Sequence, residues 1–303
     1  MQRQKQQIGA NAAQAGPGAV TRHLSLVNGQ PSNSISITDR GFQYGDGVFE
    51  TLAVDNGAPL CLTDHLERLA RGCRQLRIRE PDRALLEEEI ETVAGNLERG
   101  VLKIIISRGS SGRGYTPAAD TSPTRVVAVF DWPDYPPEYH EHGVETFLCE
   151  THLGRNPSLA GIKHLNRLEQ ILARVECRER GLPEGIMADT DGNLIEGTMS
   201  NLFLVQGNEL MTPILTHGGI RGIVRDRIIR LARSAGGIGV RELALPLAAL
   251  HGADEVFFCN SLIGIWPVRR LEKYTYAAGP VARRLRAELL ERRITCFAPR
   301  GGA

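Results

Sequence analysis

The sequence lacks several features that would mark particular classes of protein. No apolar stretch approaches the roughly 18 residues of a transmembrane helix, so we expect no membrane span. Lysine plus arginine number 36 against 35 aspartate plus glutamate, a formal net charge of +1. This balance gives no electrostatic case for nucleic acid or an anionic membrane as the main partner. A small anionic substrate stays compatible, because local arginines can bind it.

Paired cysteines and metal motifs are also missing. The six cysteines are scattered without a Cys-x-x-Cys pair, which predicts reduced thiols in a cytoplasmic protein. His140-x-His142 has no third ligand nearby, and Asp189-x-Asp191-Gly192 is too short for an EF-hand loop, so we expect no metal. The glycine-rich stretch Arg108 to Tyr115 lacks the Gly-Lys-Ser/Thr ending of a nucleotide P-loop. A nucleotide-binding module is therefore the weakest functional alternative.

Length and composition favour a two-lobed α/β protein. The chain has 303 residues, too many for one small core, and its few aromatics and 33 glycines fit α/β structure with many tight turns. Residues 1–21 are rich in Gln, Ala and Gly and are expected to form a disordered arm without the apolar core of a secretory signal. A proline-rich linker from Trp132 to Tyr139 then separates a small N-terminal α/β domain, 22–138, from a larger C-terminal domain, 139–303.

Local patterns predict the elements of the first domain. Asn28-Gly29 is a hairpin signal, with Ser34–Ile37 as the second strand. Thr63 is expected to cap a first helix, and Leu85 to face inward from a second helix that follows Pro81. The continuous apolar run Val101–Ser107 predicts a central strand.

One lysine stands at a junction that suits chemistry. Lys163 follows a loop rich in Asn, Pro and Gly, and it precedes a run with helical apolar spacing: Leu165, Leu168, Ile171, Leu172 and Val175. Such a lysine can be partly buried while its amine still reaches a ligand. Desolvation disfavours the ammonium, so Lys163 is predicted to act as a nucleophile or base near neutral pH, as a Schiff-base lysine must.

Two stretches offer backbone amides to a phosphate. Gly222-Ile223-Val224 lies where a helix is predicted to begin, so free N–H groups and the helix dipole point to one spot. Asn260-Ser261 ends a predicted strand, where ligands of α/β sheets bind. Arg68 would supply counter-charge, and Glu196, between a turn and a strand, is a candidate partner for a cationic ring nitrogen. Taken alone, each signal is more often a plain turn or a solvated side chain.

The loop from Arg108 to Tyr115 allows two interpretations. Its two arginines, Arg108 and Arg113, and its tyrosine, Tyr115, suit the binding of carboxylates. The same glycine-rich composition is typical of a flexible hairpin tip.

Six sequence blocks, taken in order, resemble the fold-type IV pyridoxal-phosphate enzymes. This class includes branched-chain and D-amino-acid aminotransferases and the aminodeoxychorismate lyases, and the resemblance covers about residues 23 to 295. The blocks are Asp39-Arg40-Gly41-x-x-Tyr44-Gly45-Asp46-Gly47-Val48-Phe49-Glu50, His65-x-x-Arg68-Leu69, Lys163-x-x-Asn166, Glu196-x-x-x-x-Asn201-Leu202-Phe203, Gly222-Ile223-x-Arg225 and Asn260-Ser261.

Three further stretches look like the lyases in particular: residues 101–109, 111–115 and 153–170. The resemblance implies that 4-amino-4-deoxychorismate is converted to 4-aminobenzoate and pyruvate, a step of folate biosynthesis. It also implies a homodimer whose two-lobed subunits hold pyridoxal 5′-phosphate between the lobes. An aminotransferase on the same scaffold, or a catalytically silent scaffold protein that kept the fold, are the alternatives.

The resemblance assigns roles to individual residues. Lys163 is implied as the Schiff-base lysine and Glu196 as the partner of the pyridinium nitrogen. The implied phosphate and cofactor contacts are Arg68, Gly222, Ile223, Val224, Asn260, Ser261 and Asn166. The candidate substrate anchors are Arg113, Tyr115, Arg108 and Arg155. The chain departs from many aminotransferases of the class at Val224, where they have a threonine, so backbone amides must carry more of the phosphate contact.

Overall fold

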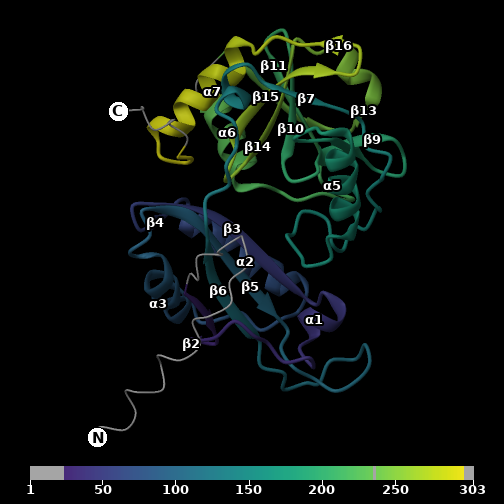
Figure 1. The fold of residues 1–303 in the computed structure, drawn as a ribbon. Coiled ribbons are helices and arrows are strands. Elements are labelled where there is room, and N and C mark those ends of the chain that lie inside the picture. The colour runs from purple at the N-terminus through teal and green to yellow at the C-terminus, as the bar shows by residue number, and fades with distance from the viewer. Residues whose placement is uncertain (1–23, 235–236, 297–303) are drawn as a thin grey trace, which may run out of the picture.

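The computed structural model describes residues 24–234 and 237–296. The expected arm at 1–21 lies outside this range. Figure 1 shows two α/β bodies, with the purple-to-teal elements below and the green-to-yellow elements above. Each body contains a sheet of its own, so the described chain has the two-lobed arrangement that the sequence predicts.

The first body is built on a six-stranded antiparallel sheet with strand order β2-β1-β6-β5-β3-β4. Its long strand β5 pairs with β3 on one side and β6 on the other, which confirms the predicted central strand. The strands are β1 Ser25–Val27, β2 Gln30–Pro31, β3 Gly47–Asp55, β4 Ala58–Pro59, β5 Arg99–Ser107 and β6 Thr124–Phe130.

The predicted strand at Ser34–Ile37 is wrong. Asn28 and Gly29 both adopt positive φ, 52° and 79°, and therefore form a two-residue turn. Val27 pairs directly with Gln30 across this turn, so the partner strand β2 follows at once.

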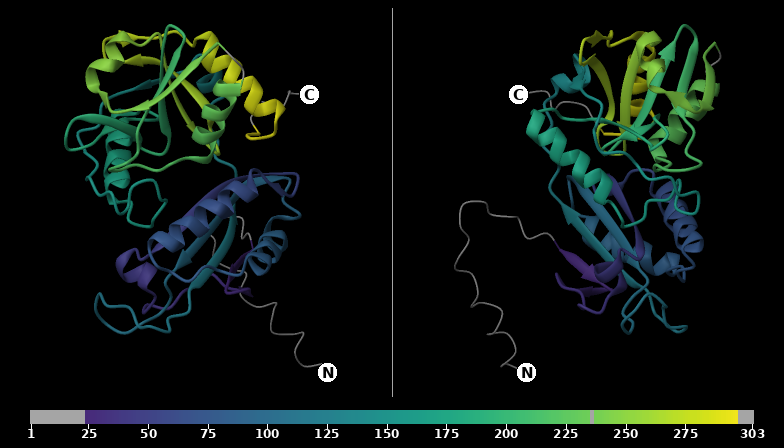
Figure 2. Two further views of the ribbon diagram at one scale, coloured as in Figure 1. Left: turned by 180° about the vertical axis from the view of Figure 1, so that it is seen from behind. Right: turned by 90° about the vertical axis from the view of Figure 1, so that its right-hand side faces the viewer.

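Helices α2 (Leu62–Gln75) and α3 (Arg83–Ala94) cover one face of this sheet, and the short α1 (Arg40–Tyr44) precedes β3 (Figure 2). The predicted cap is wrong, because α2 begins at Leu62 after Cys61 and has no side-chain cap. Leu85 is also 40% exposed rather than inward-facing. The buried stripe of α3 runs through Leu86 and Ile90. Because adjacent residues of a helix point in different directions, Leu85 lies off this stripe.

The second body contains a seven-stranded sheet and a three-stranded sheet. The larger sheet has the order β12-β11-β10-β14-β15-β16 with β7 paired to β15, and the smaller one has the order β13-β9-β8. The strands are β7 Val144–Thr146, β8 Ile186–Ala188, β9 Asn193–Gly197, β10 Asn201–Gln206, β11 Glu209–Pro213, β12 Gly239–Leu243, β13 Leu245–Pro246, β14 Glu255–Asn260, β15 Gly264–Leu271 and β16 Tyr274–Thr275.

Helices α6 (Ile223–Ser234) and α7 (Pro280–Glu291) pack on the larger sheet around Phe203, Phe257 and Ile265. A 3-10 helix, η1 (Leu247–Gly252), follows Pro246, and α4 (Glu138–Glu141) begins at the end of the linker. None of the helices within residues 24–234 and 237–296 is long and apolar enough to cross a membrane.

Helix α5 (Leu168–Arg180) turns its apolar stripe outward. Leu168, Ile171 and Leu172 are 75%, 55% and 56% exposed. The buried face carries the small residues Ala173 and Cys177, which let the helix approach the three-stranded sheet closely. The predicted periodicity is present from Leu168 on, whereas Leu165 precedes the helix, and the three large apolar side chains at 168, 171 and 172 lie on the surface.

The linker between the bodies contributes side chains to the second one. Tyr135 and Tyr139 pack edge-on against the fully buried Trp266. The first body's main core draws only on residues from Leu26 to Val129. The exact domain boundary at residues 138 and 139 stays a prediction.

Candidate active site

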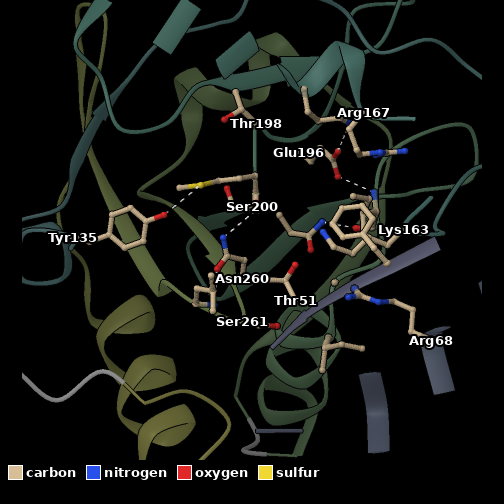
Figure 3. Close-up of a pocket in the computed structure, with 18 residues that line it drawn as sticks. Thr51, Arg68, Tyr135, Lys163, Arg167, Glu196, Thr198, Ser200, Asn260 and Ser261 are labelled. Carbon is tan, nitrogen blue, oxygen red and sulfur yellow. Dashed lines mark hydrogen bonds between the residues drawn. The ribbon is translucent and has the colours of Figure 1, made fainter. Parts of the chain in front are cut away.

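A cavity of about 290 Å³ lies where the two bodies meet (Figure 3). Its lining comes from β3 and α2 of the first body, and from the segment before α5, the β9–β10 turn, the start of α6 and the end of β14 in the second. The pocket thus collects residues that are far apart in the sequence, including Lys163, Glu196 and Arg68.

Residues 161–165, here called the lysine segment, bridge the two bodies through their backbone. Towards β3, the Phe49 N–H donates to the Lys163 carbonyl at 2.9 Å, and the Leu165 N–H donates to the Gly47 carbonyl at 3.0 Å. On the other side, the Gly161 N–H donates to the Gly219 carbonyl at 2.9 Å, and the Arg221 N–H to the Gly161 carbonyl at 3.1 Å. The main chain of Lys163 is therefore fixed from two directions.

The Lys163 amine is held among aromatic and charged groups. Its Nζ lies 4.4 Å from the centroid of the Phe49 ring. Burial, together with the positive charges of Arg68 and Arg167, lowers the pKa of Lys163 to about 8, against the opposing effect of Glu50 and Glu196. A larger fraction of the amine is therefore neutral near physiological pH than in an ordinary lysine, as the sequence predicts for a nucleophile or base.

Glu196 is buried at one side of the pocket. Its side chain is 3% exposed, its Oε2 accepts from the Ile220 N–H at 2.7 Å, and its Oε1 accepts from Gln170 Nε2 at 3.2 Å. Burial raises the pKa of Glu196, whereas the Ile220 amide and the charge of Arg167 favour its carboxylate form. This carboxylate is rigidly placed and would gain from a cationic partner in the pocket.

Arg68, Asn260 and Ser261 line the pocket together with Gly222 and Ile223 at the start of α6. Arg68 Nε donates to Glu50 at 2.7 Å and its Nη1 donates to the Arg221 carbonyl at 3.0 Å, so its position is fixed.

A Cβ at position 222 would lie 2.0 Å from Asn201 Oδ1, so any larger residue there would displace the Asn201 side chain. The neighbouring Val224 is 2% exposed and packs in the hydrophobic core, outside the pocket lining.

Five other candidate residues lie outside the pocket lining. Asn166 donates to the Gly45 carbonyl at 3.0 Å. Arg108 pairs with Asp46 and donates to the carbonyls of residues 76 and 77. Arg155 pairs with the aspartates at 189 and 191. Arg113 is exposed, and Tyr115 is 86% exposed. A single chain therefore uses Arg108 and Arg155 for internal ion pairs, and their roles as anchors stay predictions.

Sequence reasoning missed several pocket residues. Phe49 and Thr51 line the cavity from alternate positions of β3, and Arg167 and Gln170 follow Lys163 by about one and two helical turns. Both spacings were visible in the sequence, since positions i+2 on a strand and i+4 or i+7 near a helix share a side. Tyr135 gave no comparable signal, because it lies in the linker.

A fully buried carboxylate supports the turn between β9 and β10, which lines the pocket. Glu184 accepts hydrogen bonds from the Gly185 and Thr198 N–H groups at 3.0 and 2.8 Å, from the Met199 N–H at 3.3 Å and from the Ser200 hydroxyl at 2.7 Å. Burial raises the pKa of Glu184 against these hydrogen bonds. One side chain thus accepts hydrogen bonds from all three residues of this turn, 198 to 200.

The donor set fits an anionic aromatic cofactor better than a metal. Glu196 at one side of the pocket suits a protonated ring nitrogen, and Arg68 with the α6 amides suits a phosphate. Gln170 Oε1 and Arg167 Nε are buried at the pocket without a hydrogen-bond partner among the described residues. Within the same ranges, no three His, Cys, Asp or Glu side chains are placed to hold a metal ion.

Comparison with known proteins defines the class. The amino-transferase class IV family matches residues 47–271. The aminodeoxychorismate lyase of Vibrio harveyi is 36% identical over 268 residues, which cover 87% of this chain and 98% of that protein. The chain therefore belongs to the amino-transferase class IV family.

Solved structures agree with this assignment. The 4-amino-4-deoxychorismate lyase from Pseudomonas aeruginosa matches with a TM-score of 0.86 and 42% identity, over 89% of this chain and 100% of that chain. The Escherichia coli branched-chain amino acid aminotransferase matches with a TM-score of 0.79 and 27% identity, over 92% and 97%. The predicted fold-type IV architecture, mixed in α and β, is confirmed.

We predict that Glu184→Ala destabilises the protein far more than its surface counterpart Glu150→Ala. Losing the buried acceptor leaves several buried donors unpaired, which costs about 3 kcal/mol or more. The Glu150 side chain is 82% exposed, and its removal should change the free energy of unfolding by less than about 1 kcal/mol. Urea unfolding of both variants measures the difference, and equal midpoints would contradict the assigned role.

Proposed function

We propose that this protein is a pyridoxal 5′-phosphate-dependent lyase that converts 4-amino-4-deoxychorismate to 4-aminobenzoate and pyruvate in folate biosynthesis. The observation that carries the proposal is the half-buried Lys163, held by its backbone on two sides and with a lowered pKa, in the same pocket as the buried Glu196. The two lyases named above share 36% and 42% identity with the chain, against 27% for the aminotransferase, which favours the lyase reaction.

Different pocket residues would bind different parts of the cofactor. Lys163 would hold it covalently, and Glu196 would accept the hydrogen bond of the protonated ring nitrogen. Arg68, the amides at Gly222 and Ile223, and Asn260 with Ser261 would bind the phosphate. Val224 would contribute only backbone, and Asn166 would act from outside the pocket lining by holding the Gly45 carbonyl.

The cofactor, when bound, supplies an electron sink for charge left at a substrate carbon. Once released from the cofactor, the Lys163 amine would remove the proton at the amine-bearing ring carbon of the substrate, and its lowered pKa leaves part of it neutral for that task. Glu196 keeps the ring-nitrogen proton in place. The enolpyruvyl C–O bond breaks, the departing group is protonated to pyruvate, and the remaining ring becomes aromatic. Lys163 would also deliver the proton that the departing group takes up.

The substrate carries two carboxylates, and Arg167 is the pocket cation best placed to bind one. Of the described residues, Arg68, Lys163 and Arg167 are the cations that line the cavity, and the first two have other roles. The other candidates for binding a substrate carboxylate lie outside this pocket lining and could reach the substrate only from a second subunit: Arg113, Tyr115, Arg108 and Arg155.

We further propose a cytoplasmic homodimer. The outward stripe of α5, Leu168, Ile171 and Leu172, is an apolar patch of the kind that a second copy covers. All six cysteines are free, which fits a reducing compartment.

An aminotransferase on the same scaffold is the nearest rival. It would share the cofactor-binding residues and differ in the side chains that meet the substrate. Exchange of branched-chain or D-amino acids with 2-oxoglutarate would favour it. A catalytically silent scaffold would need no lysine with a lowered pKa beside a buried glutamate.

We predict that the wild-type protein releases 4-aminobenzoate and pyruvate in equal amounts from 4-amino-4-deoxychorismate. Glu196→Gln should retain bound cofactor but lose about 10²-fold or more in kcat, because the ring-nitrogen proton is no longer held. Absorbance measures the aromatic product and an enzyme-coupled assay measures pyruvate, for the wild type and the variant alike. A near-normal rate in the variant would argue against the role of Glu196.

We also predict that Leu172→Glu converts the dimer to a monomer in sedimentation or light-scattering measurements, because the charge would be buried in the interface. Leu85→Glu, on the exposed side of α3, is the matched control and should leave the dimer intact. A wild-type protein that is monomeric at micromolar concentration would overturn the proposal.

A further inference from the structure

A buried histidine connects a buried carboxylate to a hydroxyl of the pocket. His65, on α2, is 1% exposed. Its Nδ1 lies 2.6 Å from Glu50 Oε2, and its Nε2 lies 3.3 Å from Ser261 Oγ. Glu50 also pairs with Arg68, so the row from Glu50 through His65 to Ser261 lies beside the cation assigned to phosphate.

The charge of Glu50 fixes one end of this row. Burial alone would raise the pKa of Glu50, but Arg68 and His65 lower it to about 2, so it is an anion that only accepts hydrogen bonds. His65 Nδ1 must therefore carry a hydrogen and donate it to Glu50. The other ring nitrogen, Nε2, either accepts from Ser261 when the ring is neutral or donates to it when the ring is cationic.

The surroundings favour the neutral ring while no phosphate is bound. Burial lowers the pKa of His65; the carboxylate of Glu50 opposes this, and the cations Arg68 and Lys163 add to it. In the neutral state the Ser261 hydroxyl donates its hydrogen to Nε2, so that hydrogen is directed away from any ligand. A phosphate dianion bound beside Ser261 adds negative charge and favours the imidazolium.

We propose that His65 is a positioning residue that takes up one proton from solvent when the phosphate of pyridoxal 5′-phosphate binds, and thereby turns the Ser261 hydroxyl toward that phosphate. In the bound state Nε2–H donates to Ser261 Oγ, and the Ser261 hydrogen donates to a phosphate oxygen. The inference rests on the proposed function, since it requires a phosphate at this side of the pocket.

Two variants separate the ends of the row. In His65→Asn the amide nitrogen can replace Nδ1 toward Glu50, but nothing reaches Ser261. In His65→Gln the amide can reach Ser261, but the link to Glu50 is lost. Neither takes up a proton. His142→Asn makes the same change at an exposed histidine and serves as the control.

The test is a titration of cofactor-free protein with pyridoxal 5′-phosphate and, separately, with pyridoxal, which lacks the phosphate. His65→Asn should raise the Kd for pyridoxal 5′-phosphate about tenfold, the equivalent of one charge-assisted hydrogen bond, and leave the Kd for pyridoxal unchanged. His65→Gln should weaken binding less, and His142→Asn should match wild type. Unchanged affinity in His65→Asn, or an equal loss for both ligands, would overturn the inference.

Proton uptake provides the second readout. Calorimetry of pyridoxal 5′-phosphate binding in two buffers of different ionisation enthalpy should show that wild type takes up more protons than either His65 variant. The ionisation of the phosphate itself is common to all the proteins and cancels in this comparison. Equal uptake would contradict the proposed role. A wild-type protein that binds neither ligand would refute the proposed function itself, which is a distinguishable result.

Discussion

The short backbone pairing of the lysine segment is the constraint on which the site depends. Residues 161–165 pair with β3 of the first body and with the 219–221 loop of the second, through four backbone hydrogen bonds of 2.9 to 3.1 Å. Gly161 has a φ of 79°, a conformation that glycine adopts at little cost. Because the two bodies meet through this segment, the positions of Lys163, Glu196 and Arg68 are coupled, and the pocket exists only when both bodies are docked.

Charge balance explains why the pocket prefers one kind of ligand. Lys163, Arg68 and Arg167 bring positive charge into the cavity, and the opposing carboxylates are Glu196 in its lining and Glu50, which lies outside the lining and pairs with Arg68. Burying these charges is costly unless they are paired. A ligand with an anionic group near Arg68 and a cationic ring atom near Glu196 would complete the pairing at both sides. The same arrangement lowers the pKa of the Lys163 amine, so the electrostatics that select the ligand also prepare the reactive group.

The sequence predicts the parts of the site that local chemistry determines. Gly222 directly precedes α6, Ser261 directly follows β14, and Lys163 lies in the loop before α5. The residue types around each are informative, and all three line the pocket. Arg68 lines the pocket as predicted, whereas the roles of Arg108 and Arg155 stay predictions, because the role of an arginine depends on distant partners. Arg108 pairs with Asp46, 62 positions away, and a free arginine and a paired one look alike in sequence.

The fold shows the same division. The central strand Val101–Ser107 was predicted from a mostly apolar run whose one charged residue is Lys103. The α5 periodicity was visible too, but no local signal tells whether an apolar stripe faces a core or another subunit. Turn geometry at Asn28-Gly29 moved the partner strand by several residues, since a two-residue turn leaves no room for a longer connection.

The central claim is that one particular amine holds the cofactor. The chain has only four lysines, Lys5, Lys103, Lys163 and Lys273, and the Lys103 Nζ lies 5.6 Å from the centroid of the Phe49 ring that Lys163 also contacts. Reduction of the purified protein with borohydride, followed by peptide mass mapping, tests the claim directly. The account predicts a single pyridoxyl label on Lys163. A label on Lys103 or another lysine, or no label at all, would contradict it.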